Sequence, residues 1–93
     1  MSHSVSLSWN QDTDPVAGYN VFRSTTAGTE NTTPINSALV TGLTYVDTTV
    51  TAGTTYFYVV RGVSASGVIS PNSNEFEAQV PLSAPTGLTG VVV

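Results

Sequence analysis

Ionisable and redox-active side chains are scarce in this sequence, and their scarcity removes whole classes of function. The 93 residues include no cysteine, no lysine and a single histidine, His3, and only 9% of them are charged. Without cysteine the chain forms no disulfide and no thiolate metal site. One histidine in a flexible or hairpin position near the start of the chain supports neither a Ser-His-Asp relay nor a histidine-rich metal site. We therefore expect no enzyme activity and no cofactor.

Positive charge and long apolar runs are also scarce. The net charge is −4 and the only strong cations are Arg23 and Arg61, so no basic patch is present that could neutralise the phosphates of nucleic acid. No apolar run reaches 18 residues, and the opening MSHSVSLSWN has no signal-peptide pattern, so no membrane insertion is predicted. Fifteen Thr and eleven Ser hydrate the surface instead. This composition is typical of exported bacterial modules, so we expect a fragment of an extracellular or cell-surface protein.

Short alternating segments predict a protein made of β-strands. VSLSW places Val5, Leu7 and Trp9 on one face, as in a half-buried strand. Similar runs follow in YNVFRS, LTYVDTTV, YFYVVRGV and NEFEAQV, and a short edge strand is expected around Ile35 to Ser37. The side chains predicted to point inward from the later runs are Tyr19, Val21, Tyr56, Tyr58, Val60, Phe76, Ala78 and Val80. Six strands separated by turn residues indicate an all-β sandwich.

Three stretches resemble the fibronectin type III family: VSLSW, the following GYNVFRS, and VTAGTTY before the longest run. In VTAGTTY, the residues Val50, Gly53 and Tyr56 are similar to the family's tyrosine corner, although Val50 stands for a Leu and Ala52 for a Pro. The resemblance covers roughly residues 5–80. It implies a seven-strand, immunoglobulin-like Greek-key sandwich in which the Tyr56 hydroxyl bonds a backbone group near Val50.

The resemblance also exposes a gap at the start of the chain. Family members open with a strand that contains Pro-x-x-Leu, and this chain opens at the second strand. A segment of the missing kind, APTGLTGVVV, stands at the other end, with Pro85, Leu88 and the valines in the expected order. We therefore predict a sandwich over residues 1–80 and a linker with a donor-strand tail over residues 81–93.

The tail is expected to fill a neighbour's vacant position rather than its own. Returning along the sandwich requires about 25–35 Å, whereas PLSAP spans at most about 18 Å. The predicted association is therefore a head-to-tail homo-oligomer, in which the tail of one copy pairs with another copy. A filament, a ring and a closed swapped dimer all remain open. The predicted donor residues are Pro85, Leu88, Val91 and Val93, and the predicted acceptor core is Val5, Leu7 and Trp9.

Two alternatives to self-assembly remain. The tail could belong to a following domain and do nothing by itself. The whole chain could also be a monomeric spacer or binding module of a secreted bacterial enzyme or adhesin. In that case the segments Asn10 to Gly18 and Ser64 to Ser70 would present the contact loops, for a carbohydrate or protein ligand that the sequence does not specify.

Three further motifs each have a plain structural explanation beside a functional one. Asp12 and Asp14 could offer oxygens to Ca²⁺ but read more simply as a solvated turn. Asn31 begins an N-glycosylation pattern, which occurs often by chance. Outward-pointing apolar side chains on neighbouring strands predict either a lateral contact patch or isolated cross-strand pairs; they are Phe22, Phe57 and Val59.

Overall fold

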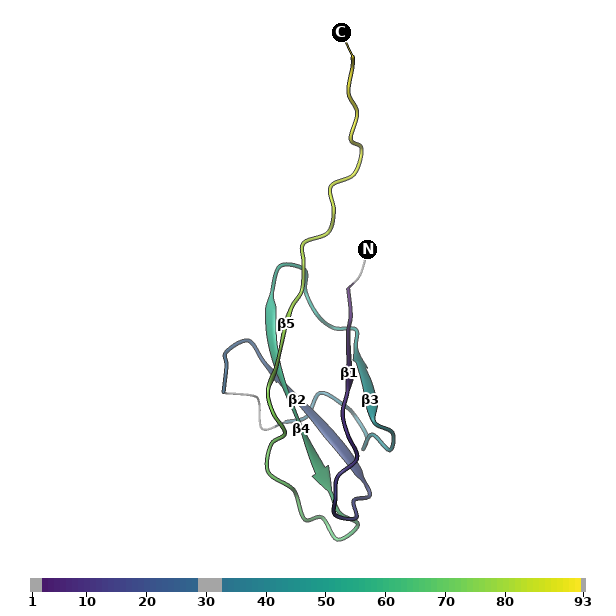
Figure 1. The fold of residues 1–93 in the computed structure, drawn as a ribbon, viewed down its shortest axis with the longest axis vertical. Coiled ribbons are helices and arrows are strands. Elements are labelled where there is room, and N and C mark those ends of the chain that lie inside the picture. The colour runs from purple at the N-terminus through teal and green to yellow at the C-terminus, as the bar shows by residue number, and fades with distance from the viewer. Residues whose placement is uncertain (1–2, 29–32, 93) are drawn as a thin grey trace.

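The structure of the chain is a computed structural model that describes residues 3–28 and 33–92. These residues form five strands: β1 (Val5–Ser8), β2 (Gly18–Ser24), β3 (Thr44–Asp47), β4 (Thr55–Val63) and β5 (Phe76–Gln79). All pairings are antiparallel, with β1 and β3 in one sheet and β2, β4 and β5 in the other, in that order (Figure 1). Nothing in the described part of the chain is a helix that could span a membrane.

The core lies between the two sheets and follows the alternation of the sequence. The buried cluster consists of Leu7, Val21, Tyr56, Tyr58, Ala78 and Val80, with Val5, Trp9 and Val60 among the residues packed against it. Strand β4 is the longest because its aromatic and β-branched residues suit a half-buried pleated surface. It pairs with β2 on one side and β5 on the other. The all-β sandwich expected from the sequence is thus confirmed.

The strand expected around Ile35 to Ser37 is wrong, because side-chain hydrogen bonds replace a backbone ladder there. Beside β2, the amide of Val21 donates to Asn36 Oδ1 at 2.8 Å, and the amide of Ile35 donates to the Val21 carbonyl at 2.8 Å. Regular pairing is reduced to one bridge between Tyr19 and Val40. This region therefore covers the edge of β2 without forming a strand.

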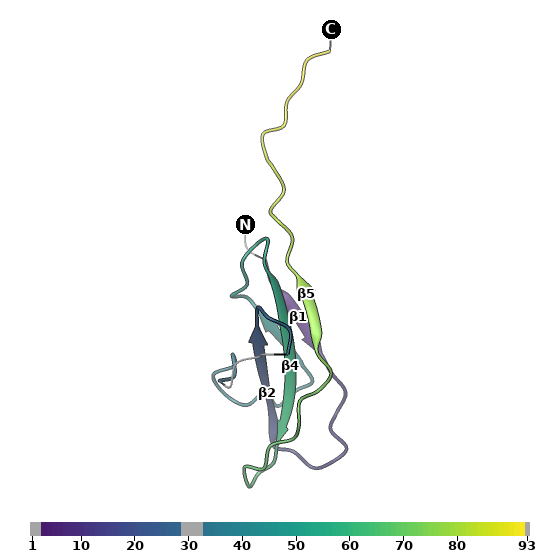
Figure 2. The ribbon, with the colours of Figure 1, turned by 90° about the vertical axis from the view of Figure 1, so that its left-hand side faces the viewer.

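Seven strands were expected from the family resemblance, and the C-terminal segment is the second region in which an expected strand is absent from the described residues. Residues 81–92 form no strand and run away from the sandwich beyond the end of β5 (Figures 1 and 2). They account for much of the 71 Å length of a molecule that is only 24 and 21 Å across. Asn31 and Val93, named above, lie outside the described residues.

The three side chains for which a lateral patch and isolated cross-strand pairs were both open are largely covered in the single chain. Phe22 is 9% exposed and Val59 4% exposed, while Phe57 is half-buried. The Arg61 guanidinium lies 5.6 Å from the centre of the Phe22 ring. In addition, the amide of Gly28, after β2, donates to the carboxylate of Glu75, before β5, at 2.7 Å. This contact joins the segment after β2 to the segment before β5.

Candidate functional site

The connection between β3 and β4 is fixed by a tyrosine. Tyr56 is buried, with an exposed fraction of 6%. Its hydroxyl accepts a hydrogen bond from the Thr51 amide at 2.8 Å. Hydrogen bonding from the Thr51 side chain, and after it from the Thr51 amide, holds the pKa of Tyr56 below its ordinary value against the opposing effect of burial. Val50 packs against the core beneath the same connection. Because the connection passes from one sheet to the other, the bond ties the two layers together.

Gly53 lies in that connection where the tail leaves the sandwich. Its φ of 78° is in the left-handed region, and a Cβ at this position would lie 2.8 Å from Leu82 Cδ2. The Gly53 amide donates to the carbonyls of Val80 and Pro81, at 2.9 and 3.3 Å. Only glycine meets both demands without strain. The sequence Gly53 to Tyr56 therefore fixes the exit direction of the tail as well as the sheet connection.

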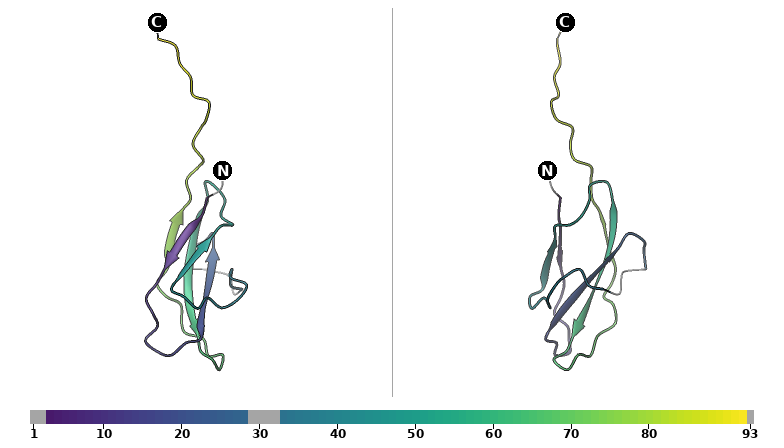
Figure 3. Two further views of the ribbon diagram at one scale, coloured as in Figure 1. Left: turned by 90° about the vertical axis from the view of Figure 1, so that its right-hand side faces the viewer. Right: turned by 180° about the vertical axis from the view of Figure 1, so that it is seen from behind.

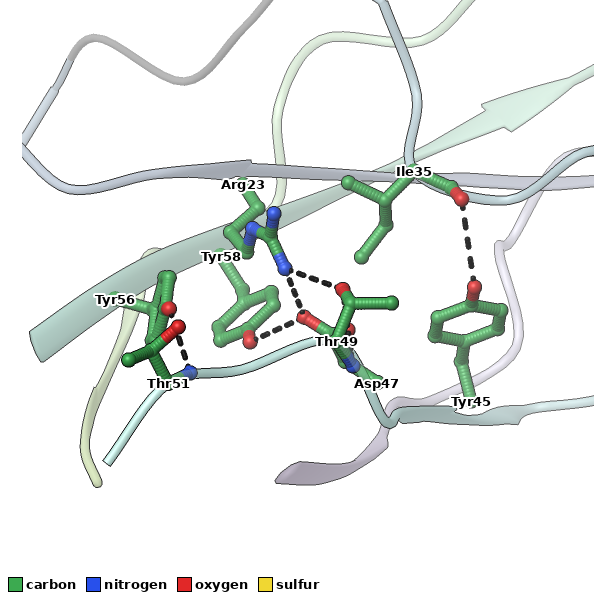
Figure 4. A network of polar contacts seen from close by, with 8 residues as sticks. All are labelled: Arg23, Ile35, Tyr45, Asp47, Thr49, Thr51, Tyr56 and Tyr58. Carbon is green, nitrogen blue, oxygen red and sulfur yellow. Dashed lines mark hydrogen bonds and ion pairs between the residues drawn. The ribbon is translucent and has the colours of Figure 1, made fainter. Parts of the chain in front are cut away.

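A buried carboxylate joins the two sheets a short distance away (Figure 4). Asp47, 2% exposed at the end of β3, accepts hydrogen bonds through Oδ2 from Arg23 Nη1 at 2.8 Å and from the Tyr58 hydroxyl at 2.7 Å. Its Oδ1 accepts from the Thr49 hydroxyl at 2.7 Å and the Thr49 amide at 3.0 Å. Arg23 also lies 5.0 Å above the Tyr56 ring. The network thus joins residues 47 and 49, at and after the end of β3, to β2 and β4 of the other sheet.

The ionised form of Asp47 is the one that the fold stabilises. Burial alone would raise the pKa of Asp47, but the hydrogen bonds from Thr49, Tyr58 and Arg23 together hold it below its usual value. The same contacts act in the opposite direction on Tyr58, whose pKa is raised by burial and by its bond to Asp47. The carboxylate is therefore charged and the phenol neutral throughout the physiological range.

The two acidic residues of the first loop form a turn. The Asp14 amide donates to Asp12 Oδ1 at 3.0 Å, and the Asp12 amide donates to the Tyr19 hydroxyl at 2.9 Å. Asp14 is exposed. No group of three or more His, Cys, Asp or Glu side chains in residues 3–28 and 33–92 could hold a metal ion. The Asx-turn geometry accounts for both residues.

Strand β1 has an unpaired edge. The Trp9 amide donates to the Leu43 carbonyl at 3.0 Å, and the register pairs Leu7 with Tyr45. In an antiparallel ladder such pairs alternate, so the backbone groups of Ser6 and Ser8 point away from β3. Within the described chain no strand pairs with β1 on that side. β1 thus presents free backbone donors and acceptors, as an edge strand does.

A groove of about 530 Å³ runs along this unpaired edge. Its walls are residues 6–10 of β1 and its continuation, residues 58–60 of β4, and Ser73, Asn74 and Phe76. Strands β1 and β5 belong to different sheets, which Figures 1 and 3 show as separate layers, and the groove has walls on both. Phe76 was expected to point into the core, yet it is 51% exposed. It is exposed because the space beside it is open.

A second, shallower groove of about 430 Å³ lies at the loop end of the sandwich. Asn10, Asp12 and Asp14 line it from the first loop, and residues 70–73 line it from the loop before β5. Trp9 borders both grooves. Its buried Nε1–H has no acceptor among the residues that the structure describes, which costs about 1–3 kcal/mol of stability.

The expected acceptor residues lie in the sandwich, and the expected donor residues that the structure describes lie on the tail beyond it. In the acceptor set Leu7 is buried, Val5 and Trp9 are half-buried, and all three belong to or pack on the core. In the donor set Pro85 is exposed, Leu88 is 96% exposed and Val91 is 88% exposed. The structure therefore does not bring the two sets together within one chain.

Two structurally important residues, Arg23 and Asp47, were missed from the sequence, although a signal for each was present. Asp47 falls on the same alternating face as Tyr45, which packs against the core. A carboxylate on an inward face needs a cation or several donors nearby. Since the chain has only two arginines, Arg23 was one of two possible ionic partners.

An antiparallel sandwich of two sheets, tied at a tyrosine corner, defines the immunoglobulin-like class of β-domains. One solved structure, described as a Fn3-like protein from Clostridium thermocellum, matches with a TM-score of 0.72 and 38% sequence identity over 88% of this chain and 81% of that one. No family profile matches the sequence. At this identity and coverage, the chain belongs to the fibronectin type III family.

Several polysaccharide-active enzymes contain a segment similar to this chain. Chitinase Chi52 of Paenibacillus xylanexedens is 46% identical over 72 residues, which cover 75% of this chain and 12% of that protein. Amylopullulanase of Thermoanaerobacter thermohydrosulfuricus is 42% identical over 74 residues, which cover 80% of this chain and 5% of that protein. The chain therefore spans only a small part of the enzymes that it matches.

Proposed function

We propose that the chain is a noncatalytic fibronectin type III module that spaces the parts of a secreted bacterial enzyme acting on polysaccharides. The observation that carries this proposal is the similarity of 36–46% to short segments of chitinases and an amylopullulanase, together with the Fn3-like fold. The buried polar network of Asp47 supports a structural role, because its groups are used in joining the sheets.

The physical form of the chain suits a spacer. The sandwich is narrow, and residues 81–92 continue from it in an extended form (Figure 1). Pro81 and Pro85 restrict φ at both ends of PLSAP, so this linker is semi-rigid rather than freely coiled. Chitin, starch and related polymers are too large to enter a cell, so an enzyme that carries this module is expected to act outside it.

The test is an assay of the purified chain on suspended chitin, starch and cellulose. A spacer releases no reducing sugar from any of them and stays in the supernatant. Retention on one polymer without hydrolysis supports the binding form of the module, with the loop-end groove of Asp12 and Asn72 as its site. Hydrolysis that co-purifies with the chain and persists after a second purification would contradict the proposal.

Self-association through the tail is a second candidate function, favoured by one specific observation. Leu88, Val91 and Val92 are 88–100% exposed on an extended segment, although burying each of them would contribute about 1.5–3 kcal/mol. Exposed apolar residues in this number on one short segment indicate a partner. A second copy of the chain offers the unpaired β1 edge described above.

The mass of the chain in solution tests this candidate. We expect the mass from light scattering to rise above 9.6 kDa with concentration. The full chain carrying Leu88→Ser and Val91→Ser should stay monomeric, and Thr86→Ser, an equally exposed change on the same segment, should behave as the unchanged chain. A mass that stays at that of one chain at millimolar concentration would contradict self-association, and the spacer function would be the remaining candidate.

A further inference from the structure

We infer that the groove along β1 is a strand-acceptor site, and that its occupant is residues 83–93 of a second copy, added antiparallel to β1. The inference rests on the second candidate function and names the surface on which it acts. Three observations carry it: the unpaired backbone of Ser6 and Ser8, the open groove between β1 and β5, and the exposed apolar tail.

The backbone of β1 specifies a strand as the ligand. The amide and carbonyl groups of Ser6 and Ser8 all face the groove, spaced two residues apart, as the alternation of the antiparallel ladder requires. Only another extended backbone meets this spacing with both donors and acceptors. Added strands bind sheet edges in this way, through main-chain hydrogen bonds for affinity and side-chain pockets for specificity.

The walls of the groove specify the side chains of that strand. Leu7, Trp9, Tyr58 and the half-exposed Phe76 belong to the apolar part of its lining, and none of the lining residues is charged. Serine and asparagine side chains make up the polar part. The tail has Leu88 followed by valines and has no ionisable side chain between Pro81 and Val93. It therefore offers apolar side chains to the apolar part of the lining and brings no charged side chain to a groove that has none.

One face of the tail can present Leu88, Val91 and Val93 together. Strict alternation would separate Leu88 from Val91, since successive side chains point to opposite faces. Gly90 lies between them, and one extra residue in a β-bulge restores the same face. Glycine is the residue that such a bulge most readily accepts.

The direction of the tail excludes its own groove and favours that of a neighbour. β1 runs away from the end at which the tail leaves, as Figures 1 and 3 show. To pair antiparallel with its own β1, the tail would have to return to the Trp9 end before turning. A second copy can be placed beyond the end at which the tail leaves, with its own Trp9 end facing that tail. The tail of the first copy then enters the groove of the second copy at Trp9 and runs toward Val5 without reversing. The same arrangement repeats from copy to copy.

Trp9, the only tryptophan, borders the groove and reports its occupation. The acceptor in this experiment is the full chain carrying Leu88→Ser and Val91→Ser, and the ligand is a synthetic peptide of residues 83–93. We expect a saturable change in Trp9 fluorescence on titration. The same peptide with Leu88→Ser should bind about tenfold more weakly or worse, because one buried leucine is lost.

Two acceptor variants test the site itself. Ser6→Pro removes the amide that faces the groove, a change that edge strands accept, and Ser6→Thr is the matched control that keeps it. Phe76→Lys places a charge in the groove. Because Phe76 is exposed, we expect this variant to fold, so it tests the site even if Ser6→Pro prevents folding. We expect binding about tenfold weaker or worse in both variants and unchanged binding in Ser6→Thr.

The outcomes separate the site from the function on which it rests. Binding that survives both Ser6→Pro and Phe76→Lys, or no binding by a chain that does self-associate, overturns the groove as acceptor while self-association stands. A wild-type chain that stays monomeric and binds no peptide overturns both.

Discussion

Single residues in this domain are held by bonds that cross between the sheets. Asp47 and Tyr56 each connect the β3 side of the sandwich to β4, one through a carboxylate and the other through a hydroxyl. The tyrosine could be recognised from its spacing to Gly53, because a short motif encodes it. Asp47 is harder to recognise, because no short motif encodes it and its role depends on Arg23, which lies 24 residues away in the sequence.

Replacing Asp47 by Asn should destabilise the domain and flatten its acid dependence. The folded pKa lies below the unfolded value of 3.8, so the contribution of the carboxylate is complete above that value and is lost as pH falls through the folded pKa. Near neutral pH we expect a loss of about 1–3 kcal/mol. Urea unfolding at pH 7 and pH 3 measures both effects. The exposed Asp14→Asn is the control, and equal losses in the two variants would contradict the role of Asp47.

Replacing Tyr56 by Phe tests the tyrosine corner. The change removes only the acceptor of the Thr51 amide, so we expect a loss of about 1–2 kcal/mol in unfolding free energy. Tyr45→Phe is the matched control, since its hydroxyl makes a long contact of 3.5 Å with the Ile35 carbonyl. Thermal denaturation of both variants gives the comparison. A Tyr56→Phe variant as stable as Tyr45→Phe would show that the corner contributes little.

At the scale of elements, alternation predicted the five long strands and the side chains of the core, because each strand has one face on that core. It failed where side chains or neighbours decide the outcome. Around Ile35 to Ser37, the Asn36 side chain takes the place of a strand. On β2 and β4, Phe22 and Val59 were assigned to the outer face and are nevertheless buried, and Arg61 lies over the Phe22 ring. Phe76 was exposed because no strand covers the groove.

Replacing Asn36 by Ala should loosen the edge of β2. Its Oδ1 accepts from the buried Val21 amide at 2.8 Å, and its Nδ2 donates to the Ala38 carbonyl at 2.8 Å and to Asn20 Oδ1 at 2.9 Å. Leaving that amide without a partner should cost about 1–3 kcal/mol. We expect hydrogen exchange at Val21 to accelerate. The exposed Ser37→Ala is the control, and unchanged protection of Val21 in Asn36→Ala would contradict this role.

At the scale of the whole molecule, the described residues form a sandwich in which the outer side of β1 is unpaired, with an extended tail that points away from it. The sequence indicated both parts, through the resemblance of its tail to the family's opening strand. It named Val5, Leu7 and Trp9 as the acceptor core but could not supply the rest of the groove, because residues of β4, β5 and the segment before β5 line it as well. Under the proposed function the module keeps neighbouring parts of an enzyme apart, and under the further inference the β1 groove and the tail join copies of the chain.

Amide hydrogen exchange at Ser6 and Ser8, measured in the intact chain over a range of concentrations, tests the open edge most directly. Both amides point into the groove and have no strand beside them in the single chain. The account predicts that their exchange slows as concentration rises, and that it stays fast at every concentration when Leu88 and Val91 are replaced by Ser. Fast exchange at both amides in a concentrated solution of the intact chain would contradict it.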